Sequence, residues 1–329
     1  MDIARVTAWA LARTPVRALL RYTEHQGAML ADSVTYRALF SIFAGVLLGF
    51  SVAALWLAGD PAAWQALIDA VDRTIPGLVG EDGLIQPDAL RVDVGFSIAG
   101  IISLVGLVGA AIGAIGSLRL ALHNIADRPT DDIAWYWVLL RNLAIAIGAG
   151  VVLGASAGVT VMGTAGLGMV ADFLGLAQDS PVVVFGTASV ALVVTFAVDT
   201  VAIALLFLLL SGERPPARSL WAGALIGGVG LTVLQTLSGL FVGGAGSNPL
   251  LASFASLIAL LLWVNLSSQV ILIAAAYIVE STHERADRVR VRFGAPTFAA
   301  RRVQRAEDAV RVASAELETA RRAQQETSV

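Results

Sequence analysis

The sequence has no cysteine and carries very little charge. Without cysteine the chain can form no disulfide, supply no thiolate nucleophile and hold no zinc ion or iron–sulfur cluster through sulfur. Only 14% of its 329 residues are charged, whereas roughly a quarter of an average soluble domain is charged. Hydrophobic residues make up 57% of the chain. This composition indicates a membrane protein.

Six apolar runs are long enough to cross the hydrocarbon core of a bilayer, which requires about 20 residues of helix. They lie at 38–58, 95–117, 138–162, 182–210, 219–242 and 250–279. The sequence therefore predicts an all-α integral membrane protein. We expect a bundle of six transmembrane helices over residues 36–282, preceded by a segment at 1–35 and followed by a charged helical tail at 283–329.

The sequence also has no lysine, and its 22 arginines are divided unequally among the segments around the runs. Twenty of them lie in the four segments 1–37, 118–141, 211–218 and 280–329. The other connections hold only Arg73 and Arg91, together with nine acidic residues. Because basic residues gather on the cytoplasmic side of membrane proteins, we expect both termini in the cytoplasm and the protein in the bacterial cytoplasmic (inner) membrane.

The N-terminal segment, residues 1–35, is a broken amphipathic stretch. Arg13, Arg17 and Arg21 follow one another at four-residue spacing, and Pro15 interrupts the pattern. We expect this segment on the inner membrane surface, with its arginines toward anionic headgroups. A solvated helix packed on the bundle explains the same pattern equally well.

Two further helices are expected outside the spans. In the connection 59–94, Asp60 is suited to cap a helix and Pro61 to begin it, which predicts an amphipathic helix over the outer mouth of the bundle. In the tail, an alanine-rich apolar seam runs from 303 to 320. It is short for a coiled coil, so an exposed helix is the preferred interpretation.

Polar residues interrupt three consecutive runs at similar depths. Asp199 lies twelve residues before Ser211, or roughly 18 Å along a helix, which places it near the middle of the bilayer. The polar residues that share its depth are Thr195, Asp199, Thr232, Gln235, Thr236, Asn265 and Gln269. Because a charge in this region is costly, we expect these side chains to form a polar pocket inside the bundle. Hydrogen bonds that only hold helices together are the alternative.

Glycines recur at four-residue spacing in three of the runs. They are Gly109, Gly113, Gly150, Gly154, Gly158, Gly223 and Gly227. This spacing lets helix backbones approach closely, so we expect these glycines at helix–helix contacts.

Several stretches of the chain carry a family resemblance. They include DSVTYRALFSIFAGVLLGF from residue 32, LRLALHNI at 118–125, WYWVLLRN at 135–142, RSLWAGALIGGVGLTVLQTL from residue 218 and ASFASLIALLLWVNLSSQVILIAAAYIVE from residue 252. Their order resembles the BrkB/YihY-like family of bacterial inner-membrane proteins over residues 30–282. The resemblance implies six spans but no agreed catalytic residue. Some members carry a ribonuclease label that is regarded as mistaken, and others are called virulence factors.

No motif of the chain indicates an enzyme. His25, His123 and His283 lie in separate segments without the spacing of metal ligands, so we predict no catalytic residue, metal or cofactor and no nucleic-acid partner. The preferred interpretation is a transporter or flippase-like carrier of an amphiphilic, envelope-related substrate, with membrane lipids as partners. A non-transporting envelope scaffold is the second hypothesis and a membrane-embedded enzyme the third.

Overall fold

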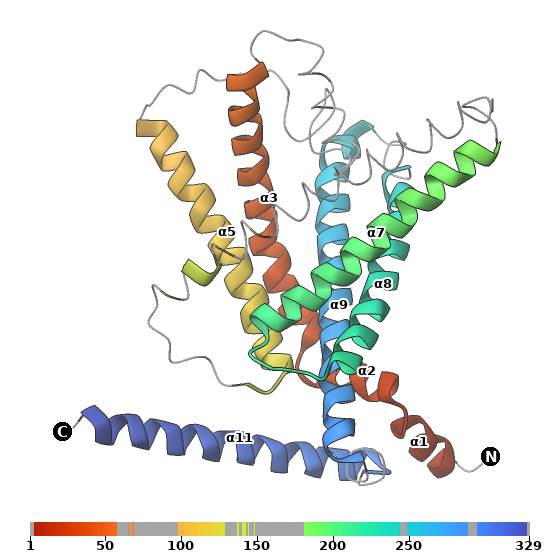
Figure 1. The fold of residues 1–329 in the computed structure, drawn as a ribbon, viewed down its shortest axis with the longest axis vertical. Helices are drawn as coiled ribbons and strands as arrows, with labels where there is room; N and C mark the ends of the chain where they lie inside the picture. The colour runs from red at the N-terminus through yellow and green to blue at the C-terminus, as the bar shows by residue number, and fades with distance from the viewer. Residues whose placement is uncertain are drawn as a thin grey trace.

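The computed structural model of the protein is built of α-helices in the part of the chain that it describes (Figure 1). This part comprises residues 3–57, 98–128, 181–243, 249–288 and 295–327, with positions 65, 68, 137, 140–142, 144 and 148. The predicted outer helix and most of the third apolar run lie outside it, as do Gly150, Gly154 and Gly158.

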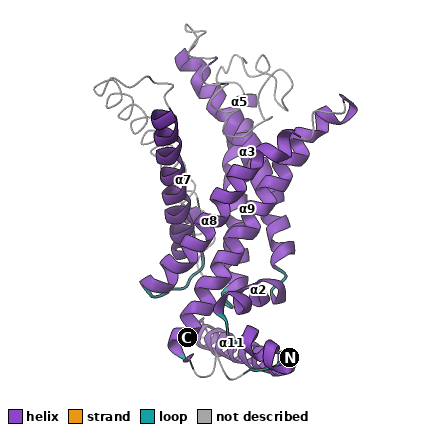
Figure 2. Cartoon of the chain, turned by 90° about the vertical axis from the view of Figure 1, so that its right-hand side faces the viewer, coloured by secondary structure: helices purple, strands orange, loops and turns teal. Residues whose placement is uncertain are grey.

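The helices form a bundle with shorter or more polar helices across one end. The bundle contains α3 (Gly27–Leu57), α5 (Ile98–Ile125), α7 (Pro181–Leu210), α8 (Ala217–Gly243) and α9 (Pro249–Ala286). The other helices are α1 (Ile3–Leu11), α2 (Thr14–Glu24) and α11 (Phe298–Thr327). Both termini lie at the end where α2 and α11 cross the bundle, which we call the terminal end (Figures 1 and 2).

Four of the described helices are long and apolar enough to cross a membrane. The spans are Val108–Ile125 in α5, Ala188–Leu210 in α7, Ala217–Leu237 in α8 and Leu257–Ala286 in α9. They coincide with the second, fourth, fifth and sixth predicted runs, and α3 covers the first. The expectation of an all-α membrane protein is therefore confirmed for the described residues, while the total of six spans stays a prediction.

Two helices continue beyond the ends of their apolar runs. The second run was expected to end at 117 and the sixth at 279, but α5 continues to Ile125 and α9 to Ala286. Three polar side chains of these extensions, Arg119, His123 and Glu280, are buried rather than solvated. Hydropathy alone therefore underestimates the length of both helices, because these polar groups contact other parts of the protein.

Close packing joins α8 to α7 and α9. A Cβ atom added at Gly223 would lie 3.0 Å from the carbonyl oxygen of Ala274 in α9, and one at Gly227 would lie 2.6 Å from Cδ1 of Ile203 in α7. Real Cβ atoms almost never come closer than about 3 Å to such neighbours. These two glycines therefore let the backbone of α8 approach both neighbouring helices.

The two glycines of α5 have different surroundings. No described atom lies within 4 Å of a Cβ placed at Gly109, and at Gly113 the nearest is a guanidinium nitrogen of Arg37 at 3.5 Å. In the described part of the chain, neither position has the close backbone contact that the four-residue spacing predicted.

The buried hydrophobic core lies toward the terminal end. It is formed by residues 31–34 of α3, 118–125 of α5 with Ala126 after it, 203–210 of α7, 220–224 of α8 and 272–279 of α9. Ala18 and Tyr22 of α2 also belong to it. The amphipathic helix α2 thus forms part of the bundle, which fixes its polar side chains against the ends of α5 and α9.

A tight turn directs α2 into the bundle. Gln26 has a φ of 54°, and α3 begins at the next residue, Gly27. A Cβ at Gly27 would overlap the ring of Tyr22 and lie 2.7 Å from the Tyr22 carbonyl oxygen. Only glycine fits there, so this residue permits the sharp change of direction between α2 and α3.

Candidate functional site

The carboxylate of Asp199 faces α8. Gln235 donates from Nε2 to the two oxygens of Asp199, at 3.1 Å and 3.4 Å, and both side chains are half-buried. Within the described ranges no basic side chain forms an ion pair with Asp199. Arg141, at the expected cytoplasmic end of the third predicted run, donates to the carbonyl oxygen of Leu209, ten residues from Asp199 along α7. An amide is thus the partner of this carboxylate in the structure.

A second polar cluster connects α9 with α3. Asn265 donates from Nδ2 to Asp32 Oδ1 at 2.7 Å and to Thr35 Oγ1 at 3.4 Å. Gln269 donates in turn to Asn265 Oδ1 at 2.7 Å. Asp32 and Thr35 are contributed by the first turns of α3, ahead of the first predicted run, and were not among the predicted site residues.

The two clusters lie on different sides of the α8–α9 pair. Successive residues of a helix are rotated by about 100°, so Asn265 lies on the face of α9 opposite Ala274. Ala274 packs against the glycine face of α8, as described above. Gln235 is turned toward α7 and Asn265 toward α3. The predicted residues are therefore arranged around two helix contacts, one at α7–α8 and one at α3–α9.

The remaining predicted residues are threonines. Thr195 is half-buried one turn before Asp199 on α7. On α8, Thr236 is exposed and donates to the carbonyl oxygen of Thr232. The Oγ1 atoms of Thr232 and of Thr200, the residue after Asp199, are buried and have no hydrogen-bond partner among the described residues. Unsatisfied hydroxyls beside Asp199 leave hydrogen-bonding capacity for a ligand at the α7–α8 contact.

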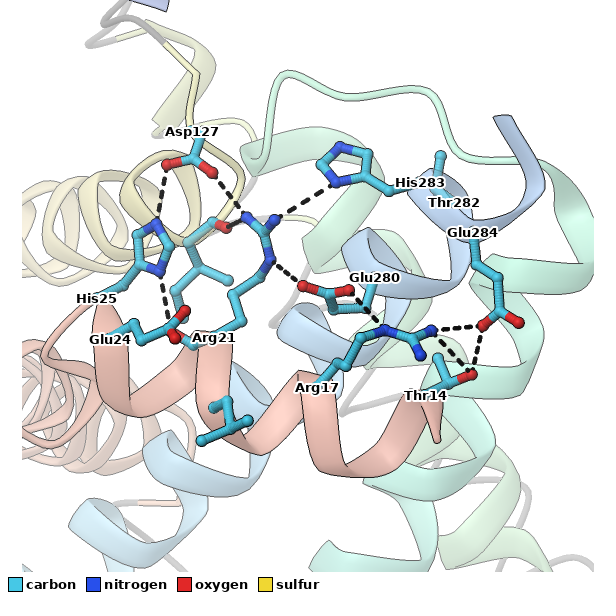
Figure 3. A network of polar contacts seen from close by, with 12 residues as sticks. Thr14, Arg17, Arg21, Glu24, His25, Asp127, Glu280, Thr282, His283 and Glu284 are labelled. Atoms are coloured by element: carbon cyan, nitrogen blue, oxygen red, sulfur yellow. Dashed lines mark hydrogen bonds and ion pairs between the residues drawn. The ribbon is translucent and has the colours of Figure 1, made fainter. Parts of the chain in front are cut away.

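A network of charged side chains, with Arg17, Arg21 and Glu280 buried at its centre, lies at the terminal end of the bundle (Figure 3). We call it the terminal network, and it consists of Arg17, Arg21, Glu24, His25, Asp127, Glu280, Glu284 and Arg301. It contains three arginines, one histidine and four carboxylates. Buried charges require such pairing, because an unpaired ion in the interior costs several kcal/mol of desolvation.

Arg17 joins α2 to the end of α9. Its guanidinium lies 3.4 Å from Glu280 Oε2 and 2.6 Å from Glu284 Oε2, and only 2% of the residue is exposed. Thr14 donates to the same oxygen of Glu284 at 2.6 Å, and Leu11 accepts from Arg17 Nη1 at 3.2 Å. The arginine is therefore bound inside the protein.

Arg21 contacts three segments at once. Its Nε lies 2.9 Å from Glu280 Oε1, and its Nη1 lies 2.7 Å from Asp127 Oδ2 and 3.0 Å from the carbonyl oxygen of Ile125. Its Nη2 lies 3.4 Å from His283 Nδ1, which must accept because arginine has no acceptor. Burial would lower the pKa of Arg21, but the charges of Glu280 and Asp127 outweigh it and raise the pKa above its ordinary value.

These contacts decide between the two interpretations of the N-terminal segment. Helix α2 is packed on the bundle, as in the second interpretation, but Arg17 and Arg21 are buried against α9 rather than solvated. Arg13 is exposed and lies 4.8 Å above the ring of Trp9. Helix α2 packs on the bundle because Glu280 and Glu284 of α9 form ion pairs with its arginines.

His25 faces acceptors with both ring nitrogens. Nδ1 lies 2.8 Å from the carbonyl oxygen of Arg21, and Nε2 lies 2.8 Å from Asp127 Oδ1. A carbonyl and a carboxylate only accept, so an N–H on either ring nitrogen has an acceptor in front of it.

Asp127 ends α5 in the left-handed region, with a φ of 51°. Its N–H bonds the carbonyl of Asn124 at 3.2 Å, and the N–H of Arg128 bonds that of His123 at 3.0 Å, the pattern of a Schellman motif. Burial alone would raise the pKa of Asp127. The hydrogen bond with His25 and the charge of Arg21 outweigh this effect and lower the pKa to about 2. The turn thus holds an ionised carboxylate against α2.

The tail helix α11 contacts this network through its first turn. Arg301 lies 2.9 Å from Glu24 Oε1 and 3.6 Å from Glu280 Oε1, and it donates to the carbonyl oxygen of Arg17 at 3.3 Å. Beyond this contact α11 is exposed, including its apolar residues Val303, Val310 and Leu317. The apolar seam is therefore uncovered within the described residues.

The terminal network was not predicted from the sequence, although the sequence contains a matching pattern of charges. Arg17 and Arg21 are four residues apart in one helix, and Glu280 and Glu284 are four apart in another. Pairs with the same spacing and opposite charge can meet along two packed helices. Arg17 and Glu280 are 263 positions apart, so the sequence does not show that the two helices meet.

The residues that the structure describes contain no group of three or more histidine, aspartate and glutamate side chains arranged to hold a metal ion.

The family of the chain follows from its sequence match to a known family model. Residues 18–295 match the model described as Virulence factor BrkB. The chain belongs to the BrkB family. No curated protein and no solved structure matches it. In this BrkB-family protein the match ends at residue 295, so α11 and Arg301 lie beyond the matched region.

Proposed function

We propose that this BrkB-family protein is a carrier of an amphiphilic, envelope-related substrate in the bacterial cytoplasmic membrane, with both termini in the cytoplasm. Asp199 carries the proposal. The carboxylate of Asp199 lies within a span, where insertion of a charged side chain costs at least about 2.5–3.5 kcal/mol. Gln235 is the hydrogen-bond partner of this carboxylate. A carboxylate held by one amide can exchange that partner for a proton or a polar headgroup.

The surroundings of Asp199 support the same role. The buried hydroxyls of Thr200 and Thr232 lack partners among the described residues, so polar capacity remains at the α7–α8 contact. The described core and the terminal network both lie toward one end of the bundle, which favours a protein that is closed at its terminal end. A carrier requires closure on one side while its substrate site is reached from the other.

A scaffold that holds envelope components is the second candidate. The observation in its favour is the Asp32–Asn265–Gln269 chain, in which amide donors are paired across α3 and α9 as expected of hydrogen bonds that join helices. An enzyme finds less support, because the BrkB family is not known as a family of enzymes.

Replacement of Asp199 separates carrier from scaffold. The full chain is reconstituted in liposomes with fluorescently labelled phosphatidylglycerol, and movement of the probe between leaflets is followed by dithionite quenching. We expect Asp199→Asn to reduce movement at least tenfold while the melting temperature in detergent stays within a few degrees. The matched control is Asp32→Asn, which removes a carboxylate from the α3–α9 contact and should leave movement intact.

A scaffold gives the opposite result. The amide of Asp199→Asn would still bond Gln235, so this variant would complement a deletion strain fully, and only Asp199→Leu would lower the melting temperature. If liposomes that contain the wild-type protein move the probe no faster than liposomes without protein, the hypothesis of a lipid carrier is contradicted. Full complementation by Asp199→Asn would contradict a role of the Asp199 carboxylate in transport.

A further inference from the structure

A cavity lies between α11 and the corner where α2 meets α9. Its volume is about 410 Å³, and it is lined by five arginines, two histidines and four acidic residues. We propose that this cavity binds a phosphate group, carried by an anionic lipid headgroup or by a small soluble compound. The proposal does not depend on transport.

The charges of the cavity favour an anion. Arg17, Arg21 and Arg301 are paired with the acids of the terminal network, as described above. The cavity wall also contains Arg302 and Arg305, which pair with no acid in the described part of the chain. Asp308 is the fourth acid of the wall, and it pairs with Arg311, which does not line the cavity. Positive charge therefore remains uncompensated on the α11 side.

The arrangement of the donors suits a phosphate group. Arg305 lies about one turn from both Arg301 and Arg302 on α11, and all three line the cavity. A guanidinium presents its N–H groups in a planar fork that can bind two oxygens of a phosphate. Because Glu24 and Glu280 hold Arg301 in place, one of the three donors is positioned before a ligand arrives.

The position and size of the cavity fit phosphate carriers of modest size. Ligand pockets usually measure about 300–1,000 Å³, so 410 Å³ accommodates a headgroup or a small phosphorylated molecule but not acyl chains. The arginine distribution predicts that this end faces the cytoplasm, where anionic headgroups and soluble phosphates are both abundant. A bound phosphate would connect α11 to the bundle beyond the contact at Arg301.

Two charge-matched variants test the proposal. Arg302→Gln with Arg305→Gln removes the uncompensated charge from the cavity and leaves every ion pair of the terminal network intact. Arg321→Gln with Arg322→Gln removes the same charge from the distal part of α11, where both residues are exposed and outside the cavity. Neither pair of substitutions affects the core, so both variants should fold like the wild type.

Two probes distinguish the source of the phosphate. Pyrophosphate binding to the purified full chain in uncharged detergent is measured by calorimetry at constant ionic strength. Phosphatidic acid retained from nanodiscs is measured by native mass spectrometry, with phosphatidylcholine as the reference lipid. We expect binding of at least one probe to weaken at least tenfold in the Arg302/Arg305 variant and to stay within twofold of wild type in the Arg321/Arg322 variant.

Binding of pyrophosphate alone would assign a soluble ligand, and selective retention of phosphatidic acid alone would assign a lipid headgroup. Binding of both would show that the phosphate itself is recognised. Equal weakening in the two variants would overturn the proposal, because it would reflect general charge attraction to α11. Absence of binding by both probes would overturn it as well.

Discussion

Arg21 Nε lies 2.9 Å from Glu280 Oε1, and both side chains are buried where α2 packs on α9. This pair joins residues that are 259 positions apart in the sequence. Glu280 also accepts from Arg17 and lies 3.6 Å from Arg301, so one carboxylate is shared by three guanidinium groups. Loss of this carboxylate should therefore affect the packing of both α2 and α11.

Replacement of Glu280 by glutamine is expected to destabilise the protein strongly. The change leaves the buried guanidinium of Arg17 with less compensation and that of Arg21 with Asp127 alone, and removal of one partner from a buried ion pair typically costs about 3–5 kcal/mol. Glu318→Gln is the matched control, because Glu318 forms an exposed pair with Arg322 at 3.7 Å. Unfolding in detergent, followed by heat and by denaturant, should show a large loss for the first variant and little change for the second. Similar stability of the two variants would contradict a structural role for Glu280.

A series at Asp127 separates its charge from its backbone conformation. Asp127→Gly removes the contacts with Arg21 and His25 but suits the left-handed φ of 51°. Asp127→Ala removes the same contacts but keeps a Cβ in that region, which costs about 1–2 kcal/mol relative to glycine. We expect both variants to melt below the wild type, with alanine below glycine. If alanine melts no lower than glycine, the left-handed turn contributes no strain.

The stability that Asp127 contributes should depend on pH. Its pKa is lowered to about 2 in the folded protein, against about 3.9 in an unfolded chain. A carboxyl with a lowered pKa stabilises the fold fully above the unfolded value, and this contribution is lost as the pH falls toward 2. The difference in melting temperature between wild type and Asp127→Asn should be constant from pH 6 to pH 5 and should shrink below pH 4. A difference that persists unchanged at pH 2.5 would exclude Asp127 as the cause.

Alanine substitutions at two glycines should have opposite effects. A Cβ at Gly228 would overlap Oγ1 of Thr200 and lie 3.3 Å from its Cα, so Gly228→Ala forces α7 away from α8. Such overpacking typically costs about 1–3 kcal/mol. Gly109→Ala meets no described atom within 4 Å and should be neutral or stabilising by up to about 1 kcal/mol through higher helix propensity. Comparable destabilisation by both would indicate that Gly109 also lies at a helix contact.

The orientation of the chain is tested by reporter fusions. Fusions after residues 80, 125, 175, 215 and 329 should report outside, inside, outside, inside and inside, because twenty of the 22 arginines lie on the segments assigned to the cytoplasm. A phosphatase and a fluorescent protein give complementary signals for the two sides. An outward signal after residue 329 would reverse the assigned orientation of the terminal network.

The sequence alone was sufficient for the class of the protein and for most of its described spans. An apolar run cannot leave backbone groups unpaired in lipid, so length and hydropathy specify transmembrane helices almost independently of their neighbours. For the same reason Asp199 could be recognised as exceptional within its run. Gly223 and Gly227 also lie at helix contacts, as their spacing predicted.

The partners of the polar groups were decided by the tertiary structure. Spacing within one helix states which residues share a face, but it does not state which helix that face meets. Gln235 and Asn265 therefore contact α7 and α3 separately, although both were predicted at the depth of Asp199. Likewise, the burial of Arg17 and Arg21 depends on Glu280, which approaches them only after α2 folds back on α9. The energy of a charge depends on its surroundings, so a sequence pattern that is compatible with headgroups can instead form a buried network.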